Sequence, residues 1–162
     1  MKILIFTEGT ILMHKSAAGH TREEIVRQVT EKDHSVKDYS SYIPIGNSPK
    51  KITKWKQQGA KIFYLASRRK PEQIKDIKNV LKRYNFPDGE LLFRKEGEEY
   101  KDVAETMIPD VFIEDDCESI GRDEITYPHI KPKIQDKIHP IIVKEFAGID
   151  KLPNDMKELN KF

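Results

Sequence analysis

Short apolar runs rich in β-branched and aromatic residues alternate along this chain with segments of helical periodicity. Four such runs are Lys2–Phe6, Ala60–Ala66, Leu91–Phe93 and Val111–Ile113, and a weaker fifth covers Ile141–Phe146. Continuous apolar runs of this length are typical of parallel strands buried on both faces. Because they alternate with helices, the pattern predicts βαβ units and an α/β fold with a doubly wound parallel sheet.

Helix start and stop signals lie between these runs. They predict helices between residues 47 and 59, between 70 and 87, and from about 98 to 107, and a capping box at residues 21–24 predicts a fourth helix. The stretch Leu12–Ile45 is too long for a simple connection. We therefore expect one domain over residues 1–162, with a small cap insertion at 12–45 and a frayed or loosely docked tail beyond Gly148.

Composition excludes several classes of protein. The 29 basic and 27 acidic residues nearly cancel, so there is no electrostatic case for nucleic-acid binding. Cys117 is the only cysteine, which excludes an intrachain disulfide and suits a reducing compartment. The apolar run Ile3–Phe6 is too short for a signal peptide, and no stretch approaches the roughly 20 residues of a membrane span. The sequence thus predicts a cytoplasmic protein without nucleic-acid or membrane partners.

Polar residues follow the predicted strands where open parallel sheets bind ligands. Thr7-Glu8-Gly9-Thr10 follows the first strand, Ser67 the second, and Glu114-Asp115-Asp116 the fourth, while Lys101 stands early in the helix between the third and fourth strands. Hydroxyls and a lysine can bind an anion, and carboxylates are ligands that Mg²⁺ prefers.

These four places, in this order, resemble the motifs of the haloacid dehalogenase (HAD) superfamily. In that family an apolar strand ends in Asp-x-Asp-Gly-Thr, a second strand ends in Ser or Thr, a Lys follows, and a further strand ends in one or two Asp. The resemblance covers about residues 2–118 and includes a cap insertion after the first motif. It implies phosphate binding by Thr10, Ser67 and Lys101, and Mg²⁺ binding by Glu8, Asp115 and Asp116.

The first motif departs from the family pattern. Aligned on Gly9-Thr10, Phe6 stands at the nucleophilic aspartate and Glu8 at the acid/base aspartate. A phenyl ring can neither attack phosphorus nor bind a metal. The sequence therefore predicts a catalytically silent or weak binder of a phosphorylated or other small molecule. The alternative is a Mg²⁺-dependent, phosphatase-type hydrolase in which water attacks and Glu8 is the general base.

Without the resemblance, simpler interpretations apply to the same residues. The acidic run is then a solvated turn, Ser67 a helix cap, Lys101 an exposed helix lysine and Arg68 a surface charge. His14 and His20 lie in the insertion near Gly19, where a facing pair could serve as ligands or as a general base; the simpler interpretation is that they are loop residues without a role.

Overall fold

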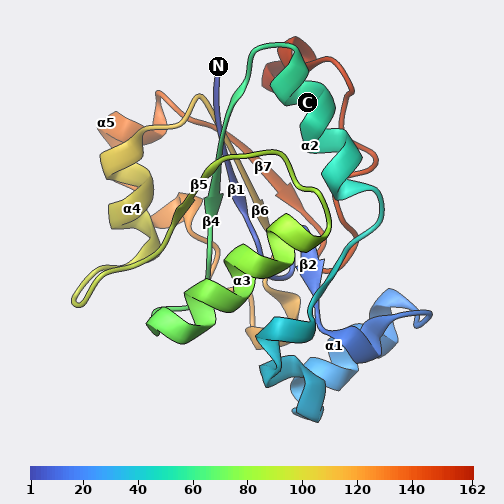
Figure 1. Ribbon diagram of the computed structural model, residues 1–162. Coiled ribbons are helices and arrows are strands. Elements are labelled where there is room, and N and C mark those ends of the chain that lie inside the picture. The colour runs from blue at the N-terminus through green and yellow to red at the C-terminus, as the bar shows by residue number, and fades with distance from the viewer.

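A five-stranded parallel sheet forms the centre of the computed structural model, which describes all 162 residues (Figure 1). The strand order is β5-β4-β1-β6-β7. The bounds are β1 Lys2–Phe6, β4 Lys61–Leu65, β5 Glu90–Leu92, β6 Val111–Asp115 and β7 His139–Val143. The predicted α/β fold with a parallel sheet is confirmed.

The central strand β1 is buried on both faces, as its apolar sequence predicts. It pairs with β4 from Lys2 to Phe6 and with β6 from Ile3 to Ile5. Successive side chains of a strand point to opposite faces. Accordingly, Ile3 and Ile5 belong to one buried cluster, and Leu4 and Phe6 to another.

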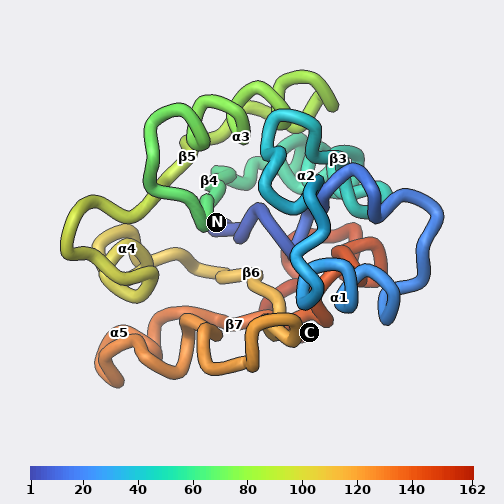
Figure 2. Tube along the Cα trace, turned by 90° about the horizontal axis from the view of Figure 1, so that it is seen from below, coloured from blue at the N-terminus to red at the C-terminus, as the bar shows by residue number.

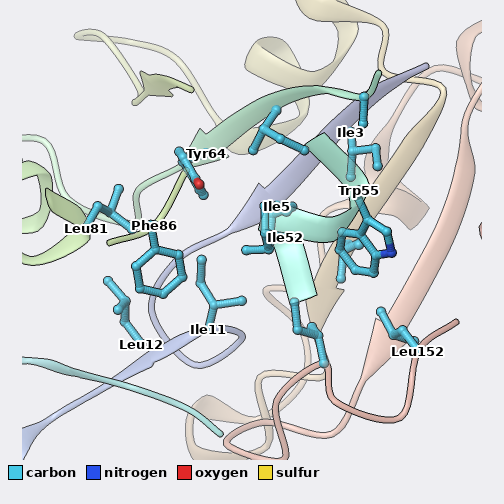
Figure 3. Close-up of a cluster of buried hydrophobic side chains, with 14 of the residues drawn as sticks. Ile3, Ile5, Ile11, Leu12, Ile52, Trp55, Tyr64, Leu81, Phe86 and Leu152 are labelled. Carbon is cyan, nitrogen blue, oxygen red and sulfur yellow. The ribbon is translucent and has the colours of Figure 1, made fainter. Parts of the chain in front are cut away.

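Helices cover both faces of the sheet (Figure 2). On one face α2 (Ser48–Gln57) and α3 (Pro71–Arg83) pack over Ile3 and Ile5, and Ile77 of α3 is fully buried. Trp55 of α2 is also fully buried there (Figure 3). On the other face α4 and the segment around α5 cover Leu4 and Phe6. The α-helices are α1 Arg22–Thr30, α2 Ser48–Gln57, α3 Pro71–Arg83, α4 Tyr100–Met107 and α5 Pro132–Gln135. None of them is long and apolar enough to cross a membrane.

The segment between β1 and α2 lies beyond the carboxyl ends of the strands (Figure 1). Its ends pair as a small antiparallel ribbon, β2 Leu12–Met13 with β3 Ile43–Pro44. Between them stand α1, which begins at the predicted capping box of Thr21 and Glu24, and three 3-10 turns, Lys15–Ala17, His34–Lys37 and Tyr39–Ser41. This places aromatic and polar side chains of the insertion next to the strand ends.

The fourth predicted strand was too short. β6 extends past Ile113 to Asp115, because the backbones of Glu114 and Asp115 continue the pairing with Ile142 and Val143 of β7. β7 itself runs from His139 to Val143, earlier than predicted, and β5 begins at Glu90 and ends at Leu92. In each case polar residues pair within the sheet, so apolar runs alone misplace the strand ends.

The prediction of a loose tail was also wrong. Residues beyond Gly148 pack on the face covered by α2, and Ile149, Leu152 and Leu159 are buried. Two side chains of α2 hold this segment: Lys51 donates to the carbonyl of Leu152 at 2.6 Å, and Trp55 donates to that of Pro153 at 2.9 Å. A few apolar residues among many charged ones are thus enough to dock the tail. One of them, Leu159, lies in the 3-10 turn Met156–Lys161.

Because β1 is buried, we expect truncation of its side chains to lower the free energy of unfolding. Ile5→Ala should lower the free energy of unfolding by about 2–5 kcal/mol, the usual cost of truncating a buried isoleucine. Ile142→Ala, at an isoleucine of edge strand β7 that is 45% exposed, is the matched control and should cost much less. Urea unfolding checks both, and equal losses would contradict the position of β1 in the core.

Candidate functional site

The ends of β1, β4 and β6 open onto a cavity of about 180 Å³. Residues from each strand end line it: Phe6, Glu8 and Gly9 from β1, Ser67 and Arg68 from β4, and Glu114, Asp115 and Cys117 from β6. The insertion closes another side with His14, Val29, Val36, Tyr39 and Tyr42, and Tyr100 and Glu145 complete much of the wall. Strand register and insertion together therefore define one partly enclosed site.

Gly9 allows the chain to turn tightly against β6. Its φ is +85°, and a Cβ placed there would lie 2.8 Å from Oδ2 of Asp115. Only glycine accommodates both the left-handed backbone and this close approach. The turn brings Thr10 next to the end of β6, where the hydroxyl of Thr10 donates a hydrogen bond to Oδ2 of Asp115 at 2.7 Å.

Glu8 connects the ends of β1 and β4. Its Oε2 accepts hydrogen bonds from the backbone N–H of Ser67 at 3.0 Å and from the hydroxyl of Thr7. Its Oε1 is buried and has no hydrogen-bond partner, although Nε of Arg68 lies 3.7 Å away. The side chain is only 10% exposed, so one oxygen of a nearly buried carboxylate is left for another group.

Phe6 fills the position where the resemblance expects a nucleophile. Its ring packs edge-on against Tyr100, with centroids 4.8 Å apart, and lies 6.5 Å from the ring of Phe112. Because α4 presents Tyr100 at this point, the end of β1 contributes an aromatic wall to the cavity. No attacking oxygen replaces the missing aspartate there.

The three carboxylates predicted to bind Mg²⁺ do not converge. Asp115 accepts from Thr10 and from the N–H of Cys117, whereas Asp116 accepts from Lys144 at 2.9 Å and from the N–H of Glu145 at 3.0 Å. Asp116 is not among the residues that line the cavity. No group of three or more His, Cys, Asp or Glu is placed to hold a metal ion. Of the three, Glu8 and Asp115 line the cavity.

The predicted anion-binding residues are divided between two places. Ser67 lines the cavity, where its hydroxyl accepts from Nε and Nη2 of Arg68 at 3.0 and 2.9 Å. Thr10 is buried and its hydroxyl is engaged by Asp115. Lys101 lines a different hollow and pairs with Glu99 at 2.7 Å. The structure thus brings Ser67, but not Lys101, to the cavity.

Several lining residues escaped sequence reasoning. Arg68 is not a plain surface charge: its guanidinium lies 4.9 Å from the centroid of Tyr39 and donates to the hydroxyl of that tyrosine at 2.7 Å. The position of Arg68 directly after Ser67 at a strand end was the available signal. No sequence signal pointed to Tyr39 or Glu145, because Tyr39 lies in the insertion and Glu145 in the segment after β7.

Three carboxyl groups that line the cavity are buried and have raised pKa values. Burial raises the pKa of Glu114 to about 7, although the N–H groups of Thr126 and Tyr127 oppose this by donating to it. Burial also raises the pKa of Asp115 and of Glu145. Cys117 stands beside them, and burial followed by the charge of Asp115 raises the pKa of its thiol, which disfavours thiolate chemistry.

The two histidines of the insertion do not form a pair. Nε2 of His14 lies 2.8 Å from Gln28 Oε1, and the ring is buried at the cavity wall. His20 is exposed, lies just before α1, and contacts Glu24 in the first turn of that helix.

Comparisons with known proteins place the fold. The chain is similar to a class C acid phosphatase from Bacillus anthracis solved with tungstate bound, with a TM-score of 0.56 and 14% identity over 99% of this chain and 77% of that one. A structure of the Pnkp1/Rnl/Hen1 complex matches with a TM-score of 0.49 and 16% identity. The match covers 89% of this chain but only 46% of the chain in that complex. No family model and no curated protein matches the sequence. The fold is therefore Rossmann-like α/β and similar to that of an acid phosphatase.

Proposed function

We propose that the chain is a small-molecule binding protein on a HAD-like, phosphatase-related scaffold that lacks the covalent step of phosphoryl transfer. One observation carries the proposal: Phe6 occupies the end of β1 and packs its ring on Tyr100. A covalent phosphoenzyme requires a carboxylate at this point, and its loss removes many orders of magnitude of rate.

The remaining groups do not supply a substitute nucleophile. Asp115 is held by Thr10 and by the N–H of Cys117, and the hydroxyl of Thr7 donates to Glu8 and to the carbonyl of Leu65. What the site retains is a partly enclosed cavity with several aromatic side chains and a few fixed polar groups. Such cavities are typical of small-ligand sites. The fold similarity to an acid phosphatase supports a phosphoester-related origin.

One observation favours a second candidate, a hydrolase in which water attacks. Glu8 Oε1 is buried, lines the cavity through its side chain and has no hydrogen-bond partner. A general base needs a free oxygen of this kind within reach of a water molecule. The water mechanism of this class also uses a metal ion to hold the phosphoryl group, and Asp116, one of the predicted ligands, does not line the cavity.

The two candidates predict opposite outcomes for turnover. The wild-type chain should hydrolyse an aryl phosphate with Mg²⁺ at the background rate. The double variant Phe6→Asp with Glu8→Asp should gain about tenfold or more, because it restores a carboxylate nucleophile and a shorter acid/base group. Release of the phenol, measured by absorbance, checks both rates.

Circular dichroism shows whether the double variant folds. If the double variant does not fold, the turnover rate of the wild-type chain still tests the proposal. Robust wild-type turnover that is lost in Glu8→Gln would contradict a silent site and establish the water-attack hydrolase.

Metal dependence gives a further prediction. Because Asp115 accepts from Thr10 and Cys117 and Asp116 is paired with Lys144, millimolar Mg²⁺ should leave the wild-type melting temperature unchanged. Differential scanning fluorimetry with and without EDTA measures this. A rise in melting temperature that disappears in Asp115→Asn would show that Asp115 binds Mg²⁺ after all.

A further inference from the structure

The charges that line the cavity are nearly all negative. Five of the lining side chains are carboxylic acids, Glu8, Glu114, Asp115, Glu124 and Glu145, and the lining guanidinium is that of Arg68. Arg68 forms an ion pair with Glu8, and no cationic side chain pairs with the other four. A phosphate group in this cavity would face carboxylates on several sides, whereas a cation would be attracted by them.

Three of these acids are deeply buried. Glu114, Asp115 and Glu145 are 2%, 4% and 6% exposed, and each accepts hydrogen bonds only from neutral N–H or O–H groups. Buried carboxylates without an opposite charge are unfavourable, and a bound cation relieves that cost.

Aromatic side chains form another part of the cavity wall. Phe6, Tyr39, Tyr42, Tyr100 and Phe146 all line the cavity. Rings attract cations through their faces, and grouped rings are a common way to bind an ammonium group. Arg68 already illustrates this recognition within the chain, since its guanidinium stands between the ring of Tyr39 and the carboxylate of Glu8.

The size of the cavity limits the ligand. Its volume of about 180 Å³ is small beside the roughly 300–1,000 Å³ of typical ligand pockets. A cavity of roughly 150 Å³ holds one benzene molecule. The space therefore suits a body of one ring and a short head group.

We propose that this cavity binds a small organic cation, with an ammonium group beside Oε1 of Glu8 and an aromatic or aliphatic body of about one ring against Phe6 and Tyr100. The inference rests on the proposed binding function and specifies its ligand class. Glu8 Oε1 is the acceptor, because it is the buried carboxylate oxygen of the wall that lacks a hydrogen bond. The hydrogen-bonded acids Glu114, Asp115 and Glu145 add a negative electrostatic potential that favours a cation in the cavity.

Two ligands of equal size and one larger anion test the charge preference. Benzylamine, benzyl alcohol and phenyl phosphate are titrated into the full chain at neutral pH and followed by two-dimensional amide NMR. Benzylamine should bind about tenfold or more tightly than benzyl alcohol, since hydrogen bonds between charged groups are the stronger ones. Its shifts should centre on the residues of the cavity wall, Tyr39 and Tyr100 among them.

Two variants and a control identify the acids responsible. Glu8→Gln should bring the ratio of the two affinities close to one. Glu124→Gln should lower it partly, and this variant poses no threat to folding because Glu124 is exposed. Glu72→Gln removes another exposed carboxylate, from the first turn of α3 and outside the cavity, and should leave the ratio unchanged.

Equal affinity for benzylamine and benzyl alcohol, tighter binding of phenyl phosphate, or no binding of benzylamine would each overturn the inference. Tight binding of phenyl phosphate without turnover would overturn it while leaving the silent phosphatase scaffold in place. Turnover of phenyl phosphate that is lost in Glu8→Gln would instead contradict the proposed function itself.

Discussion

Parallel pairing of a fully buried β1 with β4 on one side and β6 on the other is the constraint on which the site depends. The register pairs Phe6 with Leu65 and Ile5 with both Tyr64 and Ile113, so the three strands end at one edge. Polar residues that are about 50 to 60 positions apart in sequence thereby meet, and Glu8 accepts from the N–H of Ser67 across this edge. Gly9 then lets the chain fold back beside Asp115 without a steric clash. A shift of β1 by one residue would exchange its two faces and abolish both contacts.

An aromatic ring at the end of β1 changes the chemistry of that edge. Where the HAD pattern expects an aspartate, Phe6 removes a charge and packs on Tyr100, and the neighbouring carboxylates are then held by backbone N–H and hydroxyl donors. Those hydrogen bonds stabilise several acids close together. They also leave the cavity with apolar walls and an excess of negative charge, which are complementary to an organic cation and unfavourable for a phosphate. A phosphatase-like fold can therefore carry a site of different specificity.

Sequence reasoning succeeded where a local pattern has one structural outcome. The apolar run Lys2–Phe6 had to be a buried strand, and Thr21 with Glu24 forms the predicted capping box. It failed where tertiary contacts decide. Glu114 and Asp115 belong to β6 because their backbones pair with β7, whatever their side chains, and Leu159 docks a charged tail that looked frayed. At the site, positions at strand ends were predicted for Glu8, Ser67 and Asp115. The direction of each side chain was not, so the turn of Asp116 towards Lys144 and the ion pair of Lys101 with Glu99 could be seen only in the structure.

A crystal grown with benzylamine, Mg²⁺ and phosphate together places the two accounts of this cavity in direct competition. We expect benzylamine in the cavity with its nitrogen at Oε1 of Glu8, its ring against Phe6 and Tyr100, and no metal ion on Asp115. A Mg²⁺ ion bound by Glu8 and Asp115, with phosphate beside Ser67, would contradict the account.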